Sequence, residues 1–264
     1  MNELLRSQGA GLVLGANSFS LLVQRLQGDF ENEIFHDWPT VILTQTIQVT
    51  VVSLFKLLPP ANEIAEIVDS RSIATLIRNV IDTYDVMKMM IASNSPDEHQ
   101  LNRNILGYYV SGRFAHIQSR IDRQSIQKFY PLAKEKYWEK ILESPLYDKV
   151  RMAKLKSGES VFYRSRTERI SDVCGKDTEF VSGILADLSA HVHSIPPTLW
   201  LGSSSNAYID DDQTRNVLAL WIRIANFYYA QAIELVVKAT GYERSENLEK
   251  FTNHHKSVFS DPVQ

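Results

Sequence analysis

The sequence predicts an all-α protein, a single-domain multi-helix bundle with a long buried helix near its C-terminus. Apolar residues recur at helical spacing along most of the chain. Residues 212–240 are apolar on nearly every side, which is typical of the central helix of a bundle. Residues 41–58 are rich in β-branched side chains, but no second strand-like segment stands elsewhere to pair with them, so a helix is favoured there too.

The chain divides into three expected parts, which are an N-terminal helix and linker (1–36), the helical bundle (37–242) and a polar, flexible tail (243–264). The first helix covers residues 3–27, and an acidic linker follows at 29–36. The glycines of this helix follow no strand, so we interpret them as sites of close helix packing; they are Gly9, Gly11 and Gly15.

Local start and stop signals set the order of the other helices. Asp37 as N-cap and Pro39 in the first turn begin the segment that Pro59 and Pro60 end. Asp69 or Ser70 caps the next helix. The later helices are expected at 71–93, 97–126, 131–155 (one or two helices, broken near Pro145), 161–173, 177–194 and 212–240.

Composition limits the class of protein. The formal net charge is −3, which favours neither a nucleic-acid coat nor attachment to an anionic membrane. The one cysteine, Cys174, allows no intramolecular disulfide, suits a cytoplasmic protein and is expected to be a small buried apolar group. Residues 41–58 carry seven polar or charged side chains, so we expect a buried or half-buried helix and no membrane partner.

Polar and titratable side chains are concentrated in the helix expected at 177–194, namely Asp187, Ser189, His191 and His193. Asp187 and His191 are four residues apart and share one helical face, whereas His193 lies about 200° around the helix from His191. Two ligands do not complete a metal site, so no metal and no cofactor is expected. An Asp–His hydrogen bond in a polar core network is the favoured interpretation, and a catalytic site is the alternative.

Nucleophilic catalysis has weaker support in the sequence. Ser189 and His193 are four residues apart, as a serine and its base could be, but no serine stands in a Gly-x-Ser-x-Gly turn. Cys174 precedes Gly175 at a helix C-terminus, where the helix dipole disfavours a thiolate.

Two charged segments are candidate binding sites. Arg71 and Arg78 share a helical face, and Asp82 follows Arg78 by four residues. These side chains form either an intrahelical surface pair or part of a polar pocket with Asp187 and His191. The basic stretch Lys149–Arg169, which includes Arg164 and Arg166 and has aromatic residues beside it, is either a solvated helix face or an RNA-binding surface.

Two segments carry a resemblance to a known group of proteins. RSIATLIRNVIDTYDVM (71–87) and EFVSGILADLSAHVHSIPPTLW (179–200) together resemble an uncharacterised family of bacterial all-helical domains placed near the HEPN superfamily. The specific element is Leu188-Ser189-Ala190-His191-Val192-His193, and the resemblance covers about residues 40–240. It implies a helical bundle and a role in bacterial defence or toxin–antitoxin biology.

HEPN ribonucleases carry an arginine followed, after four to six residues, by a histidine, and no arginine of this chain has a histidine at that distance. The sequence therefore favours a non-enzymatic protein that binds an unidentified protein or small molecule, with a homodimer as a further candidate. The alternative is a HEPN-like, metal-independent ribonuclease or RNA-binding protein using His191, His193 and His116 with Arg71, Arg78 and Arg120. A metal-dependent hydrolase built on Asp187 and His191 is the third hypothesis.

Overall fold

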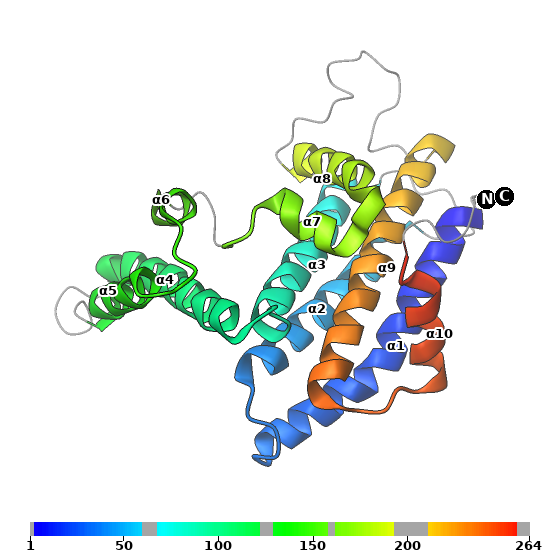
Figure 1. Cartoon of the computed structure of the whole chain (residues 1–264). Coiled ribbons are helices and arrows are strands. Elements are labelled where there is room, and N and C mark those ends of the chain that lie inside the picture. The colour runs from blue at the N-terminus through cyan, green and yellow to red at the C-terminus, as the bar shows by residue number, and fades with distance from the viewer. Residues whose placement is uncertain (1–2, 60–67, 122–128, 158–161, 193–210, 258–264) are drawn as a thin grey trace. The chain divides into compact units, whose positions relative to one another are not determined.

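The computed structural model describes residues 3–59, 68–121, 129–157, 162–192 and 211–257 (Figure 1). Every regular element in these ranges is a helix, so the predicted all-α class is confirmed. The elements are α1 (Glu3–Glu31), α2 (Trp38–Leu57), α3 (Ser70–Ile91), α4 (Pro96–Ile121), α5 (Phe129–Leu142), α6 (Lys149–Ser157), α7 (Arg166–Cys174), the short 3₁₀ turn η1 (Gly175–Asp177), α8 (Thr178–Val192), α9 (Asp212–Thr240) and α10 (Glu246–His255).

Packing divides the chain into two compact units, each described by itself below. The first comprises residues Met1–Met87 and Arg169–Gln264, and the second comprises Lys88–Glu168. The domain boundaries expected near residues 37 and 243 remain predictions.

Helix α9 forms the core of the first unit, as the sequence predicts. Asp211 caps its N-terminus by accepting a hydrogen bond from the backbone N–H of Thr214, and Gly241 ends it in the left-handed conformation (φ 68°). Its large aromatic side chains are almost fully buried: Trp221, Tyr228 and Tyr229. α9 contacts α1, α2 and α10 (Figure 1), and the rings of Tyr84 on α3 and Tyr228 lie edge to face with centroids 5.4 Å apart. The long buried helix near the C-terminus is therefore confirmed.

Helix α10 lies within the segment 243–264, which the sequence predicts to be a polar, flexible tail. It packs on α1 and α9 with one face buried, formed by Leu248, Phe251, Thr252 and His255. Ser245 accepts a hydrogen bond from the backbone N–H of Leu248 and caps the helix. The sequence analysis does not predict this helix, in which spacings of three and four bring the few apolar side chains onto one face.

Glycines of α1 permit the close approach of α10, as we predict from the sequence. A Cβ atom on Gly15 would lie 2.8 Å from the Phe251 ring, and one on Gly11 would lie 2.7 Å from His255 Nε2. The helix also continues to Glu31, through the first residues of the expected linker. The turn after it places Glu33 in the left-handed region (φ 59°), which is unfavourable for a residue with a side chain.

The second unit is built on the packing of α4 against α5. Its core consists of Leu101, Ile105, Ile141, Met152 and Leu155. The predicted break near Pro145 is confirmed, because α5 ends at Leu142 and α6 begins at Lys149.

Candidate functional site

Helix α8 brings Asp187 and His191 together on the side that faces α9. The indole N–H of Trp221 donates to Asp187 Oδ2 over 3.1 Å. His191 Nδ1 lies 3.0 Å from the backbone oxygen of Asp187 and 3.5 Å from its Oδ1, and the His191 and Trp221 rings meet edge to face at 4.8 Å. Trp221 is 2% exposed, so its N–H needs this acceptor. The sequence predicts the Asp–His pair but not its third member.

Ser189 lies on a different side of α8 and contacts α3. Its hydroxyl donates to the backbone oxygen of Leu185 over 2.6 Å and accepts a hydrogen bond from Arg78 Nη1. Arg78 Nη2 lies 3.5 Å from Asp82 Oδ2, in the intrahelical pair that the four-residue spacing predicts. A serine whose proton already binds a carbonyl oxygen is poorly prepared to act as a nucleophile.

These contacts form two separate groups and not the common pocket of Arg78, Asp82, Asp187 and His191 that the sequence offers as one possibility. Asp187 and Ser189 are two residues apart, so their side chains leave α8 about 200° apart. Arg71 is exposed at the beginning of α3. His193 falls outside the residues that the structure describes, as do the side chains of His116 and Arg120.

A buried ion pair in the first unit escapes prediction from sequence. Arg169 Nε on α7 lies 2.7 Å from Asp85 Oδ2 on α3, and Asp85 is 8% exposed. Burial, together with the charge of Asp85, raises the pKa of Tyr84 above its ordinary value. Cys174 is buried beside these groups, with its Sγ 3.8 Å from the Tyr228 hydroxyl oxygen, so the expected burial of this thiol is confirmed.

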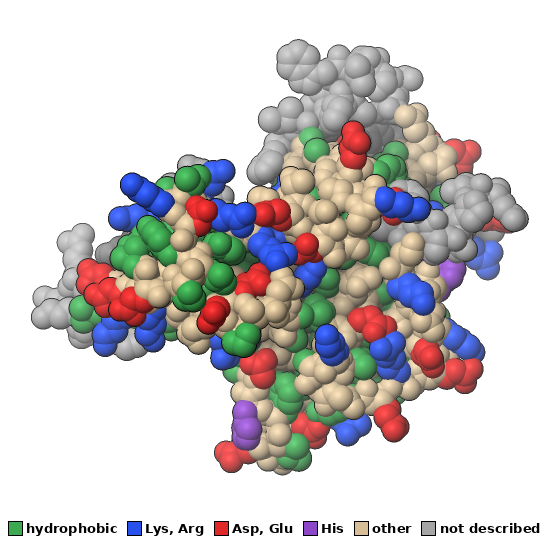
Figure 2. Space-filling model, in the orientation of Figure 1, with side chains coloured by type: hydrophobic (Ala, Val, Ile, Leu, Met, Phe, Trp, Pro, Cys, Tyr) green, Lys and Arg blue, Asp and Glu red, His purple; other side chains and the backbone are tan. Residues whose placement is uncertain are grey.

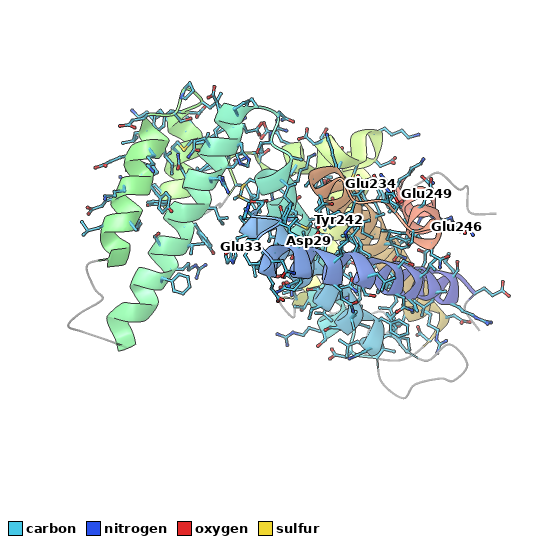
Figure 3. All side chains as sticks on the ribbon, turned by 90° about the horizontal axis from the view of Figure 1, so that it is seen from below. Asp29, Glu33, Glu234, Tyr242, Glu246 and Glu249 are labelled. Atoms are coloured by element: carbon cyan, nitrogen blue, oxygen red, sulfur yellow. The ribbon has the colours of Figure 1, made fainter. Side chains whose placement is uncertain are left out.

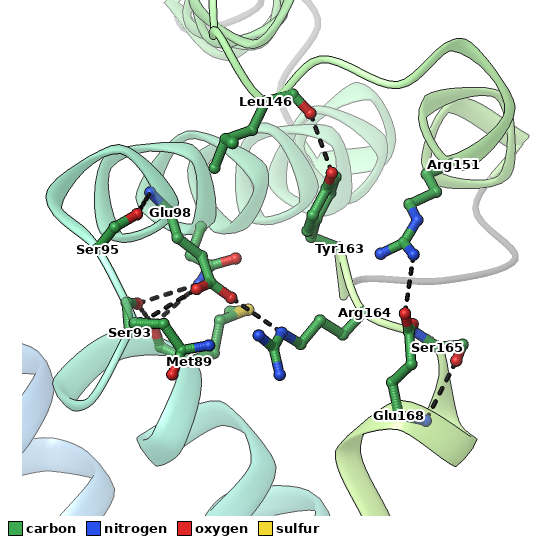
Figure 4. A network of polar contacts seen from close by, with 12 residues as sticks. Met89, Ser93, Ser95, Glu98, Leu146, Arg151, Tyr163, Arg164, Ser165 and Glu168 are labelled. Atoms are coloured by element: carbon green, nitrogen blue, oxygen red, sulfur yellow. Dashed lines mark hydrogen bonds and ion pairs between the residues drawn. The ribbon is translucent and has the colours of Figure 1, made fainter. Parts of the chain in front are cut away.

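The arginines of the basic stretch Lys149–Arg169 are largely neutralised within the second unit (Figure 4). Arg164 Nε lies 3.0 Å from Glu98 Oε1, and Arg151 Nη2 lies 2.8 Å from Glu168 Oε1. The backbone N–H of Ser165 donates to Glu168, and this bond is the main reason why the pKa of Glu168 falls to about 2. Ser165 and Glu168 thereby form a capping box at the beginning of α7.

What remains exposed and basic in this stretch lies mainly on α6, where Lys and Arg side chains gather in Figure 2. Lys149, Lys154 and Lys156 are exposed, and α6 contains no acidic residue. The Lys156 ammonium lies 5.3 Å from the centre of the Trp138 ring on α5. Arg166, the other predicted binding residue here, is exposed at the first position of α7.

Helix α2 presents an apolar face to solvent that the sequence does not distinguish from its buried face. Val41, Thr44, Ile47, Val51 and Leu54 face the bundle. On the opposite side, Trp38 is 57% exposed, Ile42 39% and Val49 64%. Residues 38–55 include no charged side chain. The hydroxyls of Thr46 and Thr50 donate to the helix's own carbonyl oxygens over 2.8 Å each, and the amide of Gln45, on the same side, donates to Gln27 Oε1.

By length and composition α2 could also cross a membrane, although only 39% of its most apolar window is buried in the protein and one such helix is weak evidence. Within the described ranges, no group of three or more His, Cys, Asp or Glu side chains is arranged as a metal site. No family model, curated protein or solved structure matches this chain.

Proposed function

We propose that this protein is a non-enzymatic interaction protein that binds a macromolecular partner through the exposed face of α2. The observation that carries the proposal is the combination of Trp38, Ile42 and Val49 in solvent with the absence of charge from residue 38 to residue 55. Several exposed apolar side chains gathered on one uncharged helix face typically mark an interaction site. A cytoplasmic setting in bacterial defence or toxin–antitoxin biology is part of the proposal, by resemblance alone.

The hydrogen bonds made by the polar side chains of α8 support a binding role rather than catalysis. Asp187 accepts the indole hydrogen bond of a buried tryptophan, and the Ser189 hydroxyl binds a backbone carbonyl oxygen. Side chains that hold helices together in this way can reach a substrate only by breaking those hydrogen bonds. The polar residues of α8 are therefore better explained as parts of the core.

Site-specific photo-cross-linking tests the proposal. We would place a photoreactive phenylalanine analogue at Val49 in cells that produce the protein, and the same analogue at Leu21, which is 67% exposed on α1, as the control. We expect a discrete adduct from position 49 that position 21 does not give. Identical adduct patterns at the two positions, or none at either, would contradict a binding role for the α2 face.

RNA binding through α6 is a second candidate function. It is favoured by the exposed lysines of α6 and by the aromatic ring of Trp138 beneath Lys156. Its weakness is that Arg151 and Arg164 are already paired with carboxylates.

Fluorescence anisotropy with a single-stranded RNA tests this second candidate. Lys149→Gln with Lys156→Gln should weaken binding and reduce the slope of log affinity against log salt by about 0.7 for each phosphate that the protein no longer neutralises. Lys238→Gln with Lys256→Gln, which removes two exposed lysines of the other unit, is the control. Absence of binding by the unmodified protein, or equal weakening in both variants, rejects the candidate.

A further inference from the structure

We infer that the α2 face pairs with the α2 face of a second copy of this chain, with the two helices antiparallel. The inference rests on the proposed function and names the partner of the same surface. At 100° per residue, Trp38, Ile42, Val49 and Lys56 fall within about 40° of one another around the helix. They therefore lie on one straight stripe, which also includes the half-buried Gln45 between Ile42 and Val49 and ends in a positive charge.

The absence of charge in the middle of the stripe suits contact with an identical surface. In a twofold interface the residues nearest the axis lie near their own counterparts, so a charged centre would repel itself. The hydroxyls of Thr46 and Thr50 are satisfied within the helix, so a partner helix can cover them without leaving a buried donor unpaired.

The two ends of the stripe are complementary only when the helices are antiparallel. Lys56 is exposed at the C-terminal end, and Trp38 is exposed at the N-terminal end, about 27 Å away by helical rise. A pair centred between Thr46 and Val49 would set Lys56 of each copy against Trp38 of the other, a cation–π contact of about 0.5–1 kcal/mol. A parallel pair would instead set the two lysines side by side.

Acidic side chains strengthen this complementarity. Glu31 and Glu33 are exposed where α1 leads into α2, and Figure 3 shows Glu33 at that end of α1. Antiparallel pairing brings Lys56 toward this acidic end of the other copy. The same acidic residues would be repelled by an anionic lipid surface, so a second copy fits the stripe better than a membrane does.

The expected dimer is weak and reversible. A single helix pair buries less than the about 800 Å² per partner of a standard interface, and interfaces at this low end of the size range are typically weak and transient. Sedimentation velocity on the purified full chain over a dilution series measures this equilibrium. We expect a monomer–dimer transition at micromolar concentrations.

Substitutions at the centre of the stripe test its location. Val49→Lys places two lysines near the twofold axis and should raise the Kd at least about tenfold, because burying an unpaired charge costs well over 1.4 kcal/mol. Val150→Lys makes the same change at a 71% exposed valine on α6 and should leave the Kd unchanged. Thermal melting of both variants checks that the fold is intact.

Charge reversal at the ends tests the orientation. Lys56→Glu should raise the Kd several-fold, and adding Glu33→Lys to it should restore the affinity. A chain that stays monomeric at all concentrations, or a dimer indifferent to Val49→Lys, would overturn the inference. A monomer that cross-links from position 49 to another protein, or co-sediments with anionic vesicles through α2, would also show that the partner is not a second copy. The binding role of this face would then still stand.

Discussion

Acid is expected to destabilise the packing of α10 because His255 must remain neutral there. The His255 side chain is 7% exposed, its ring lies 4.8 Å from the Phe251 ring, and Gly11 of α1 comes close to its Nε2. Burial lowers the pKa of His255 from 6.5 to about 3, and the positive charges of His254 and Arg223 add to this effect.

The depressed pKa fixes both the sign and the size of the pH dependence. Between pH 6.5 and about 3 the unfolded chain binds a proton at His255 that the folded protein excludes. The free energy of unfolding should therefore be unaffected by His255 above pH 6.5 and fall below it. The slope is at most about 1.4 kcal/mol per pH unit, or about 2 kcal/mol by pH 5. If α10 detaches locally from the bundle, the loss in the free energy of unfolding cannot exceed the free energy of that detachment.

Urea unfolding of the wild type and of His255→Gln at several pH values between about 7.5 and 4.5 measures this contribution. The variant has no proton to take up at position 255, so the stability of the wild type relative to it should decline as the pH falls below 6.5. His254→Gln, at the exposed neighbouring histidine, should retain most of the decline. Parallel stability curves for the wild type and His255→Gln would refute the reasoning.

Two further predictions concern contacts between helices, and urea unfolding at neutral pH measures both. Asp187→Ala should lower the free energy of unfolding by about 1–3 kcal/mol, because it leaves the indole N–H of the buried Trp221 without its acceptor; a change within about 0.5 kcal/mol would mean that the bond is not formed in solution. Gly15→Ala should destabilise by about 1–3 kcal/mol, because the added Cβ would lie 2.8 Å from the Phe251 ring. Gly28→Ala in the same helix meets no atom within 4 Å and should instead stabilise by about 0.5–1 kcal/mol; equal effects at the two glycines would contradict close packing at position 15.

Local sequence signals predict α9 well and α10 poorly. Asp211 and Gly241 are strong cap residues on either side of a long apolar run, so the expected bounds 212–240 coincide with those observed. Residues 243–264 have the composition of a solvated tail, and the short apolar face of α10 becomes meaningful only against the glycines of α1, more than two hundred residues earlier. Composition alone therefore fails to predict a short helix whose stability comes from tertiary packing.

The candidate sites show the same limit. Helix geometry alone places Asp187 beside His191 and Arg78 beside Asp82, because each pair is four residues apart. The pair of Arg164 with Glu98 joins residues 66 positions apart, so no local sequence pattern predicts it. The basic stretch resembles a binding surface in the sequence because the acids that neutralise its arginines are partly contributed by another helix.

The polar residues of α8 are explained by the two helices that it contacts. Its apolar residues Val181, Ile184, Leu185 and Leu188 are buried, and apolar packing alone tolerates small rotations and shifts of a helix. The bond from Trp221 to Asp187 ties one side of α8 to α9, and the bond from Arg78 to Ser189 ties another side to α3. Directional hydrogen bonds on two sides define both the rotation and the axial position of the helix. A catalytic helix would need the opposite arrangement, with these groups held by the protein but still open to a substrate.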